Sequence, residues 1–139
     1  MNAIKSAMIA LLLTLSFVAS SALAGEKDPL FINATSDDAH RAEMALAFSK
    51  NELERQHPVT VFLNDKAVFI ASKPNAERFK NQQALLTSLM DKGATVLVCP
   101  ICLKYYGITE TDLLPGVKMG NPELVDAALF KENTKTLSW

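Results

Sequence analysis

The chain of 139 residues has few cysteines, glycines and histidines, and no excess of charge of either sign. Two cysteines are too few for the dense disulfide frameworks that hold very small secreted folds together. Five glycines, six prolines and no low-complexity run argue against a disordered chain. Fourteen basic residues against fifteen acidic ones exclude a nucleic-acid binder held by bulk positive charge. The composition, 49% hydrophobic and 21% charged, therefore predicts one globular domain with a packed core.

The first 24 residues have the three parts of a secretory signal peptide. Lys5 supplies the positive start, residues 7–18 are apolar, and Ala22-Leu23-Ala24 is a small-residue cleavage site. The apolar stretch is too short and too rich in Ser and Thr for a membrane span, and no basic stop-transfer cluster follows it. We therefore predict a signal peptide over residues 1–24 and an exported domain over residues 25–139. That domain would have no membrane contact after cleavage, and would be periplasmic in a Gram-negative host.

From residue 29 on, short apolar runs alternate with segments of helical periodicity. Such alternation predicts a parallel sheet covered by helices on both faces, with right-handed crossovers. Residues 67–71 are predicted to extend the second strand or to form a short extra one. Strands are predicted at 30–34, 59–63, 94–98, 117–119 and 134–139, and helices at 39–56, 76–92 and 121–131, with a further short helix ending at Gly107.

One local motif carries chemistry, namely Cys99-Pro100-Ile101-Cys102 directly after the third predicted strand. Two cysteines three residues apart at a helix start can face one side, and the N-H groups there favour a thiolate. Lys104 is close enough in sequence to add positive charge. A structural disulfide is the alternative, although so short a loop would constrain the unfolded chain little. A zinc site is less favoured, because the chain has two histidines and no second C-x-x-C.

Beside this motif stand four further segments, so that the set is Phe31–Asp38, Val59–Asp65, Val96–Cys102, Gly107–Ile108 and Asp112–Val117. Together these segments resemble the DsrE/DsrF-like family, also called YchN-like, over residues 28–139. The resemblance implies a flavodoxin-like α/β three-layer sandwich, with a mostly parallel five-stranded sheet of order 2-1-3-4-5 and helices on both faces. It also implies homo-oligomers (dimers, trimers or hexamers), and a cysteine after the third strand that carries sulfur as a persulfide.

Cys99, eight residues before Gly107, is similar in position to the sulfur-carrying cysteine of the family. Cys102 resembles a second thiol that a subset of the family has. Two features differ from the characterised sulfur-relay members. Those members work in the cytoplasm with partner subunits, whereas this chain is predicted to be exported, and its second thiol offers an internal disulfide that competes with a persulfide.

The order 2-1-3-4-5 would place residues 35–40 beside Cys99, at the carboxyl ends of the first and third strands. Asp37 or Asp38 then either caps the first helix or orients a substrate. His40 is either an exposed helix residue or a base and thiolate partner. Asn64-Asp65 is interpreted first as a turn. Three methionines, at 44, 90 and 119, are interpreted as packing residues rather than copper ligands.

Three functions remain open from the sequence. The favoured one is a sulfur carrier or sulfurtransferase-like protein, with Cys99 as persulfide site and Cys102 as resolving thiol. The alternatives are a dithiol/disulfide redox protein and a non-enzymatic oligomeric protein that binds a small ligand or a metal. No organic cofactor is implied, and the expected partners are further copies of the chain and a sulfur donor or acceptor protein.

Overall fold

The computed structural model describes residues 27–139, so the predicted signal peptide lies outside the described residues. Five strands form one sheet in the order β4-β3-β2-β1-β5, and every pairing within it is parallel. The strands are β1 (Leu30–Ala34), β2 (Val59–Leu63), β3 (Thr95–Val98), β4 (Lys118–Met119) and β5 (Lys135–Ser138).

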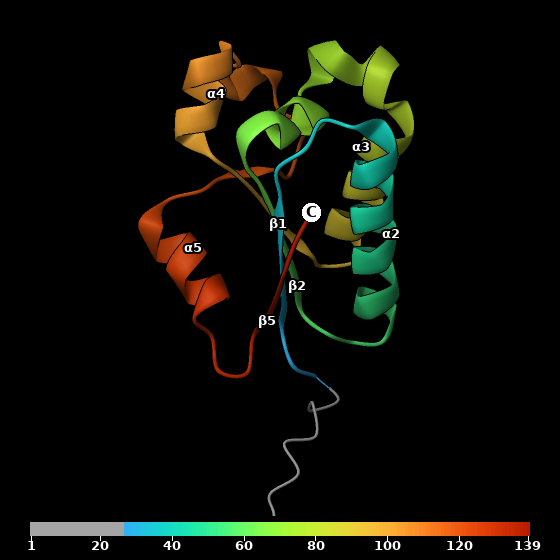
Figure 1. Cartoon of the computed structure of the whole chain (residues 1–139), viewed down its shortest axis with the longest axis vertical. Coiled ribbons are helices and arrows are strands. Elements are labelled where there is room, and N and C mark those ends of the chain that lie inside the picture. The colour runs from blue at the N-terminus through green and yellow to red at the C-terminus, as the bar shows by residue number, and fades with distance from the viewer. Residues whose placement is uncertain (1–26) are drawn as a thin grey trace, which may run out of the picture.

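Helices lie on both faces of the sheet, which confirms the predicted flavodoxin-like α/β class (Figure 1). Helices α2 (Ala39–Glu54) and α3 (Ala76–Asp91) pack side by side on one face, and α5 (Pro122–Leu129) lies on the other. The short α4 (Pro100–Tyr106) sits beyond the carboxyl end of β3. Within residues 27–139, no helix is both long and apolar enough to cross a bilayer.

The strand order differs from the predicted 2-1-3-4-5, because β2 rather than β1 is the neighbour of β3. Successive strands β1 to β4 are added in one direction across the sheet, and β5 returns to the far side of β1. Right-handed crossovers then place α2 and α3 on one face and α5 on the opposite face. The carboxyl end of β3 therefore lies beside the carboxyl end of β2, and Cys99 directly follows β3.

Residues 67–71, predicted as strand, belong instead to a 3-10 helix, η2 (Asp65–Ala71). The buried positions in this segment are Ala67, Val68, Ile70 and Ala71. Their spacing of three and four residues buries one side of a helix, whereas a strand would bury alternate residues. Asn64 caps the start of η2, with its side chain accepting the N-H of Asp65.

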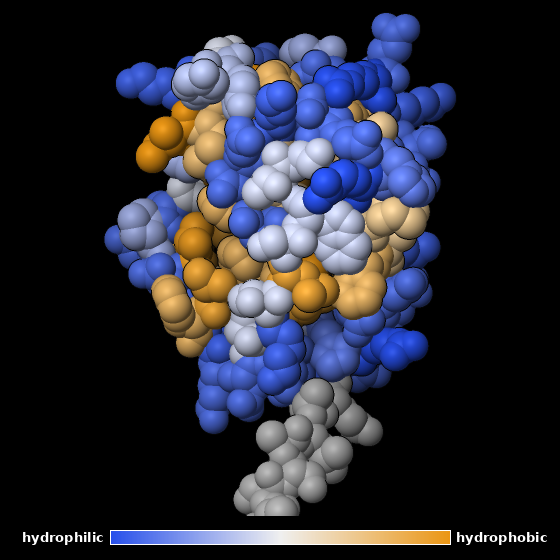
Figure 2. Space-filling model, viewed as in Figure 1, coloured by the Kyte–Doolittle hydropathy of each residue, from blue (hydrophilic) through white to orange (hydrophobic). Residues whose placement is uncertain are grey.

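The core lies mainly between the sheet and the pair α2–α3. On α2 the buried residues are Ala42, Ala45, Leu46 and Ser49, which recur at spacings of three and four residues. On the opposite face α5 contains no buried residue and every residue of β5 is exposed. Figure 2 shows apolar side chains gathered around α5 and β5 on this side of the molecule. One face of the sheet is thus closed and the other is only partly covered.

Candidate functional site

Cys99 forms the junction between β3 and α4. Its N-H donates to the carbonyl of Leu63 at 3.0 Å, which continues the sheet one residue beyond β3. Its extended backbone then makes it the N-cap of α4, and its Sγ accepts the N-H of Cys102 at 3.2 Å. Pro100 fits the first helical turn, where an N-H would have no helical partner. The helix ends at Gly107, whose φ of 68° is left-handed, as the sequence predicts.

Cys102 is held by the end of β2. Its Sγ donates to Asn64 Oδ1 at 3.1 Å and accepts the N-H of Asp65 at 3.3 Å. Both cysteines are half-buried free thiols. Partial burial, followed by the hydrogen bond to the Cys99 thiol, raises the pKa of Cys102. The two thiols therefore have different surroundings, and Cys102 is the one whose protonated form is favoured.

Tyr106 ties α4 to η2 next to the thiols. Its hydroxyl donates to Asp65 Oδ1 at 2.5 Å, and this hydrogen bond raises the pKa of Tyr106 to about 12. The Tyr106 ring packs against Phe69 of η2, with ring centroids 4.8 Å apart. Asp65 has a φ of 44°, in the left-handed region. Asn64, Asp65 and Tyr106 thus surround the cysteine pair. From the sequence, Asn64-Asp65 is interpreted as a turn, and none of these residues is placed at the site.

The residues after β1 do not reach the cysteine pair, because β2 lies between β1 and β3. Asp38 caps α2 by accepting the N-H of Arg41 at 2.8 Å, and Asp37 pairs with Arg78 at 2.9 Å. His40 is exposed in the first turn of α2. The predicted placement of these three residues beside Cys99 is therefore corrected, and Asp38 has the capping role.

Lys104 is exposed in the last turn of α4. The neighbouring charges that shift the pKa of Cys102 belong to Cys99 and Asp65, not to this lysine. Across residues 27–139, the side chains of His, Cys, Asp and Glu form no group of three or more that is placed to hold a metal ion.

The model of the DsrE/DsrF-like family matches residues 29–133 of this sequence. The chain belongs to that family. An uncharacterised protein of Methanocaldococcus jannaschii is 36% identical over 80 residues, which are 57% of this chain and 70% of that protein. An uncharacterised protein of Methanopyrus kandleri is 34% identical over 80 residues, 57% of this chain and 66% of that protein.

Two solved structures share the fold of this DsrE/DsrF-like chain at low sequence identity. A protein of unknown function from Methanobacterium thermoautotrophicum has a TM-score of 0.67 and 16% identity, covering 80% of this chain and 98% of its own. The ychN protein of E. coli has a TM-score of 0.63 and 21% identity, covering 81% and 99%.

The site of this DsrE/DsrF-like chain faces open surface. On α4, Ile101 is 79% exposed and Tyr105 is 81% exposed, and their spacing of four residues puts them on one side of the helix. Large apolar side chains that are exposed together are typical of contact surfaces for another molecule. Both cysteines are partly exposed, and α4, which carries Cys102, lies at one end of the sheet (Figure 1).

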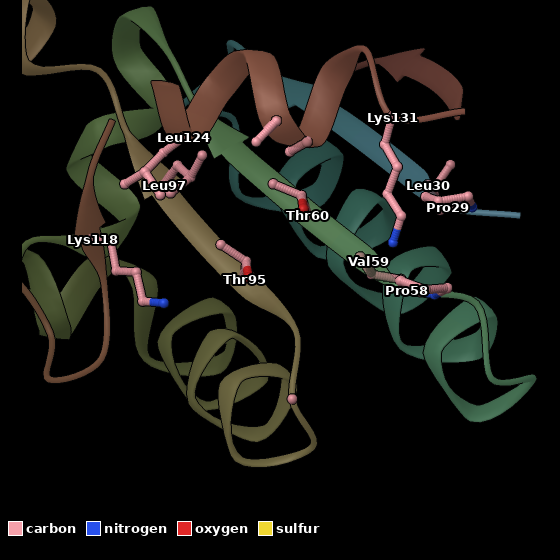
Figure 3. A pocket seen from close by; sticks show the side chains of 13 residues that line it. Pro29, Leu30, Pro58, Val59, Thr60, Thr95, Leu97, Lys118, Leu124 and Lys131 are labelled. Carbon is pink, nitrogen blue, oxygen red and sulfur yellow. The ribbon is translucent and has the colours of Figure 1, made fainter. Parts of the chain in front are cut away.

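A cavity of about 300 Å³ lies under α5, toward the amino ends of the strands (Figure 3). Thr60 and Thr95 lie on its floor, and the long side chains of Lys118 and Lys131 flank it. Neither cysteine lines this cavity, and neither does any binding residue predicted from the sequence. In this member of the DsrE/DsrF-like family, the cysteine pair is therefore separate from the cavity under α5.

Proposed function

We propose that this chain carries sulfur as a persulfide on Cys99, with Cys102 as the thiol that releases it. The observation that carries the proposal is the hydrogen bond from the Cys102 N-H to Cys99 Sγ at the start of α4. A donated N-H and a helix N-terminus stabilise a thiolate, which is the form that attacks sulfur. Membership of the DsrE/DsrF-like family supports the proposal, because sulfur relay and redox roles are associated with that family.

The transfer of sulfur from a donor to Cys99 needs no external oxidant or reductant. The Cys99 thiolate attacks the outer sulfur of a donor persulfide, R-S-SH. The S-S bond of the donor breaks, a new S-S bond forms between Cys99 Sγ and the transferred sulfur, and the electron pair leaves on the R-S⁻ thiolate. The product is a persulfide on Cys99.

Release uses the second thiol. Cys102 attacks Cys99 Sγ, a Cys99–Cys102 disulfide forms, and the transferred sulfur leaves as hydrogen sulfide. The two cysteines lose the two electrons that the sulfur gains, and a dithiol reductant must then reduce the disulfide. The raised pKa of Cys102 suits this role, because it keeps Cys102 protonated while Cys99 acts as the first nucleophile.

The proposal extends to location and partners. The signal-peptide pattern of residues 1–24 supports an exported, periplasmic protein in a Gram-negative host. The exposed Ile101 and Tyr105 beside the thiols support contact with a sulfur donor or acceptor protein. Intact-mass analysis of the protein from its export compartment tests the predicted export and cleavage. We expect a chain that begins at Gly25.

The decisive experiment exposes the reduced protein to inorganic polysulfide and maps the cysteine peptides by mass. We expect the Cys102→Ser variant to retain one added sulfur atom on Cys99. The wild type should instead release sulfide and finish as the Cys99–Cys102 disulfide. A disulfide that forms in the wild type without sulfide, together with an unmodified Cys99 in Cys102→Ser, would identify a dithiol redox protein.

Cys99→Ser is the matched control. Serine is also a good N-cap residue, so this variant should keep the start of α4 and the fold. We expect its remaining thiol, Cys102, to take up sulfur at least about tenfold more slowly than Cys99 does in Cys102→Ser. Equal rates of sulfur uptake in the two folded variants would contradict the special role of Cys99. In urea, where both chains are unfolded, we expect the two rates to be equal.

A further inference from the structure

A second cavity, of about 310 Å³, opens where β1, β2 and β5 end on the α5 face of the sheet. Its walls are mainly apolar, with Phe31 and Phe62 from the sheet and Leu129 from α5. Asn33, Asn64 and Thr136 supply polar atoms to its lining. The volume is at the lower end of the range for small-molecule sites, so it suits a compact ligand rather than a large cofactor.

Asn33 is the unusual residue of this cavity. It lies in β1, in register with Phe62 of β2 on one side and with Ser138 of β5 on the other. Its Oδ1 is buried and accepts no hydrogen bond from any residue in the described range 27–139. A buried acceptor without a donor is costly and uncommon in folded proteins. A ligand that carries an N-H would satisfy it.

Asn64 connects the cavity to the thiols. Its side chain lines the cavity, and its Oδ1 accepts the hydrogen bond from Cys102 Sγ at 3.1 Å. A molecule seated against Asn33 and Asn64 is therefore one side chain away from the cysteine pair. The sheet places both asparagines on one face, because Asn33 pairs with Phe62 and Asn64 comes two residues after Phe62.

We propose that this cavity binds the amide-bearing body of a low-molecular-weight thiol or persulfide, whose N-H donates to Asn33 Oδ1 and whose sulfur is directed past Asn64 toward the cysteines. The apolar walls favour a neutral amide over an ammonium group, because an unpaired charge would be costly there. The side-chain amide of Asn64, which lines the same cavity, can donate to the carbonyl of the same ligand amide. This inference rests on the proposed function and names its small-molecule substrate class.

The test uses N-acetyl-S-methylcysteinamide, which has two amides and no free thiol, so that binding is separate from sulfur chemistry. Titration into the ¹⁵N-labelled protein should shift the side-chain amide signals of Asn33 and Asn64 in NMR spectra. Asn33→Leu keeps the size of the side chain and removes its polar atoms. We expect this variant to bind the probe at least about tenfold more weakly, because the ligand N-H then loses its acceptor.

Asn51→Leu is the matched control, because Asn51 is an exposed residue of α2 on the other side of the sheet. The affinity of this variant for the probe should equal that of the wild type. Three results would overturn the inference. The first is that Asn33→Leu binds the probe as tightly as the wild type does. The second is that the probe shifts signals of residues away from this cavity, and the third is that the wild type does not bind the probe.

A further comparison separates the inference from the proposed function. With N-acetylcysteinamide persulfide as the donor, Asn33→Leu should load Cys99 about tenfold more slowly than the wild type. With inorganic polysulfide, the two proteins should load Cys99 equally. Failure of the probe to bind, with normal loading from polysulfide, would overturn only the inference. Normal binding of the probe with no sulfur on Cys99 would overturn the proposed function.

Discussion

Cys99 and Cys102 differ in what their sulfur atoms contact, although they are only three residues apart. Cys99 Sγ receives a backbone N-H, whereas Cys102 Sγ donates to Asn64 and lies against η2. The sequence alone predicts that both thiols belong to the start of a helix. It does not predict which one is held in the protonated form, because Asn64 and Asp65 reach Cys102 only through the pairing of β2 with β3.

We expect iodoacetamide to label Cys99 before Cys102 in the reduced protein near neutral pH. The raised pKa of Cys102 lowers the fraction of this thiol that is ionised, and the thiolate is the form that reacts with iodoacetamide. Peptide mass mapping after short exposures gives the order of labelling. Labelling of Cys102 first would contradict this expectation, and labelling at similar rates in urea is the control.

Tyr106 provides a prediction for alkaline pH. Its pKa in the folded chain, about 12, lies above the ordinary value of 10, so folding favours the neutral phenol. The stability that this contributes is fully present below pH 10 and is lost as the pH rises through about 12. We expect ultraviolet absorbance to show Tyr106 ionising above pH 10.

Asp65→Asn is the control for Tyr106, because asparagine tolerates the left-handed backbone at this position. The carboxylate oxygen that accepts the Tyr106 hydroxyl is then absent, so the titration should move back toward pH 10. An unchanged titration in this variant would mean that the hydrogen bond to Asp65 is not the cause of the raised pKa.

At the scale of elements, helix caps and breakers were predictable, and the burial of polar side chains was not. Pro100 and Gly107 mark the two ends of α4 in the sequence as they do in the structure. Gln82 and Gln83 of α3 are buried, although the periodicity of apolar residues does not indicate it. Each donates to a backbone carbonyl outside α3, Gln82 to Ala39 and Gln83 to Ser72, and such long-range partners have no local sequence signal.

Gly120 fixes how closely the start of α5 approaches the sheet. A Cβ at this position would lie 2.9 Å from the carbonyl oxygen of Val98 and 3.2 Å from the Phe62 ring. We expect Gly120→Ala to lower the free energy of unfolding by about 1–3 kcal/mol, because a backbone atom cannot move aside cheaply. Urea unfolding followed by circular dichroism measures the change.

Gly107→Asn is the comparison for Gly120→Ala. Nothing lies within 4 Å of a Cβ at Gly107, and asparagine tolerates its left-handed φ of 68°. This variant should remain within about 1 kcal/mol of the wild type. If Gly120→Ala proves as stable as Gly107→Asn, the close approach is not a constraint on the fold.

At the scale of the whole molecule, the pattern of strands was predictable and their order was not. Alternating strands and helices with right-handed crossovers are satisfied both by 2-1-3-4-5 and by the observed β4-β3-β2-β1-β5. The apolar run of β3 does indicate an interior strand, and β3 lies between β2 and β4. The run does not reveal which strand lies next to it. For that reason the residues after β1, rather than those after β2, were expected beside Cys99.

The open face of the sheet leads to a prediction about assembly. Phe130, directly after α5, is 76% exposed, and Leu124 and Leu137 nearby are each 39% exposed. The resemblance to the family implies homo-oligomers, and we propose that a second copy of the chain covers this region. Sedimentation should then give a mass above that of the monomer, and Phe130→Asp should weaken the assembly roughly tenfold or more.

Met44→Asp is the control for assembly. Met44 is 41% exposed, but it lies on α2, on the closed face of the sheet. Its replacement should leave the sedimenting mass unchanged. A wild-type protein that sediments as a monomer at all concentrations would contradict the proposal, and so would equal effects of the two substitutions.

The sheet joins segments that are far apart in the sequence. β5 pairs with β1, and both the N-H and the hydroxyl of Thr35 donate to the carbonyl of Trp139, 104 residues away. During synthesis, β1 leaves the ribosome long before β5 exists, so one edge of β1 has no partner while most of the chain is being translated. Contacts of such long range are formed late and slowly in folding. This edge of β1 therefore gains its strand partner only after β5 has emerged.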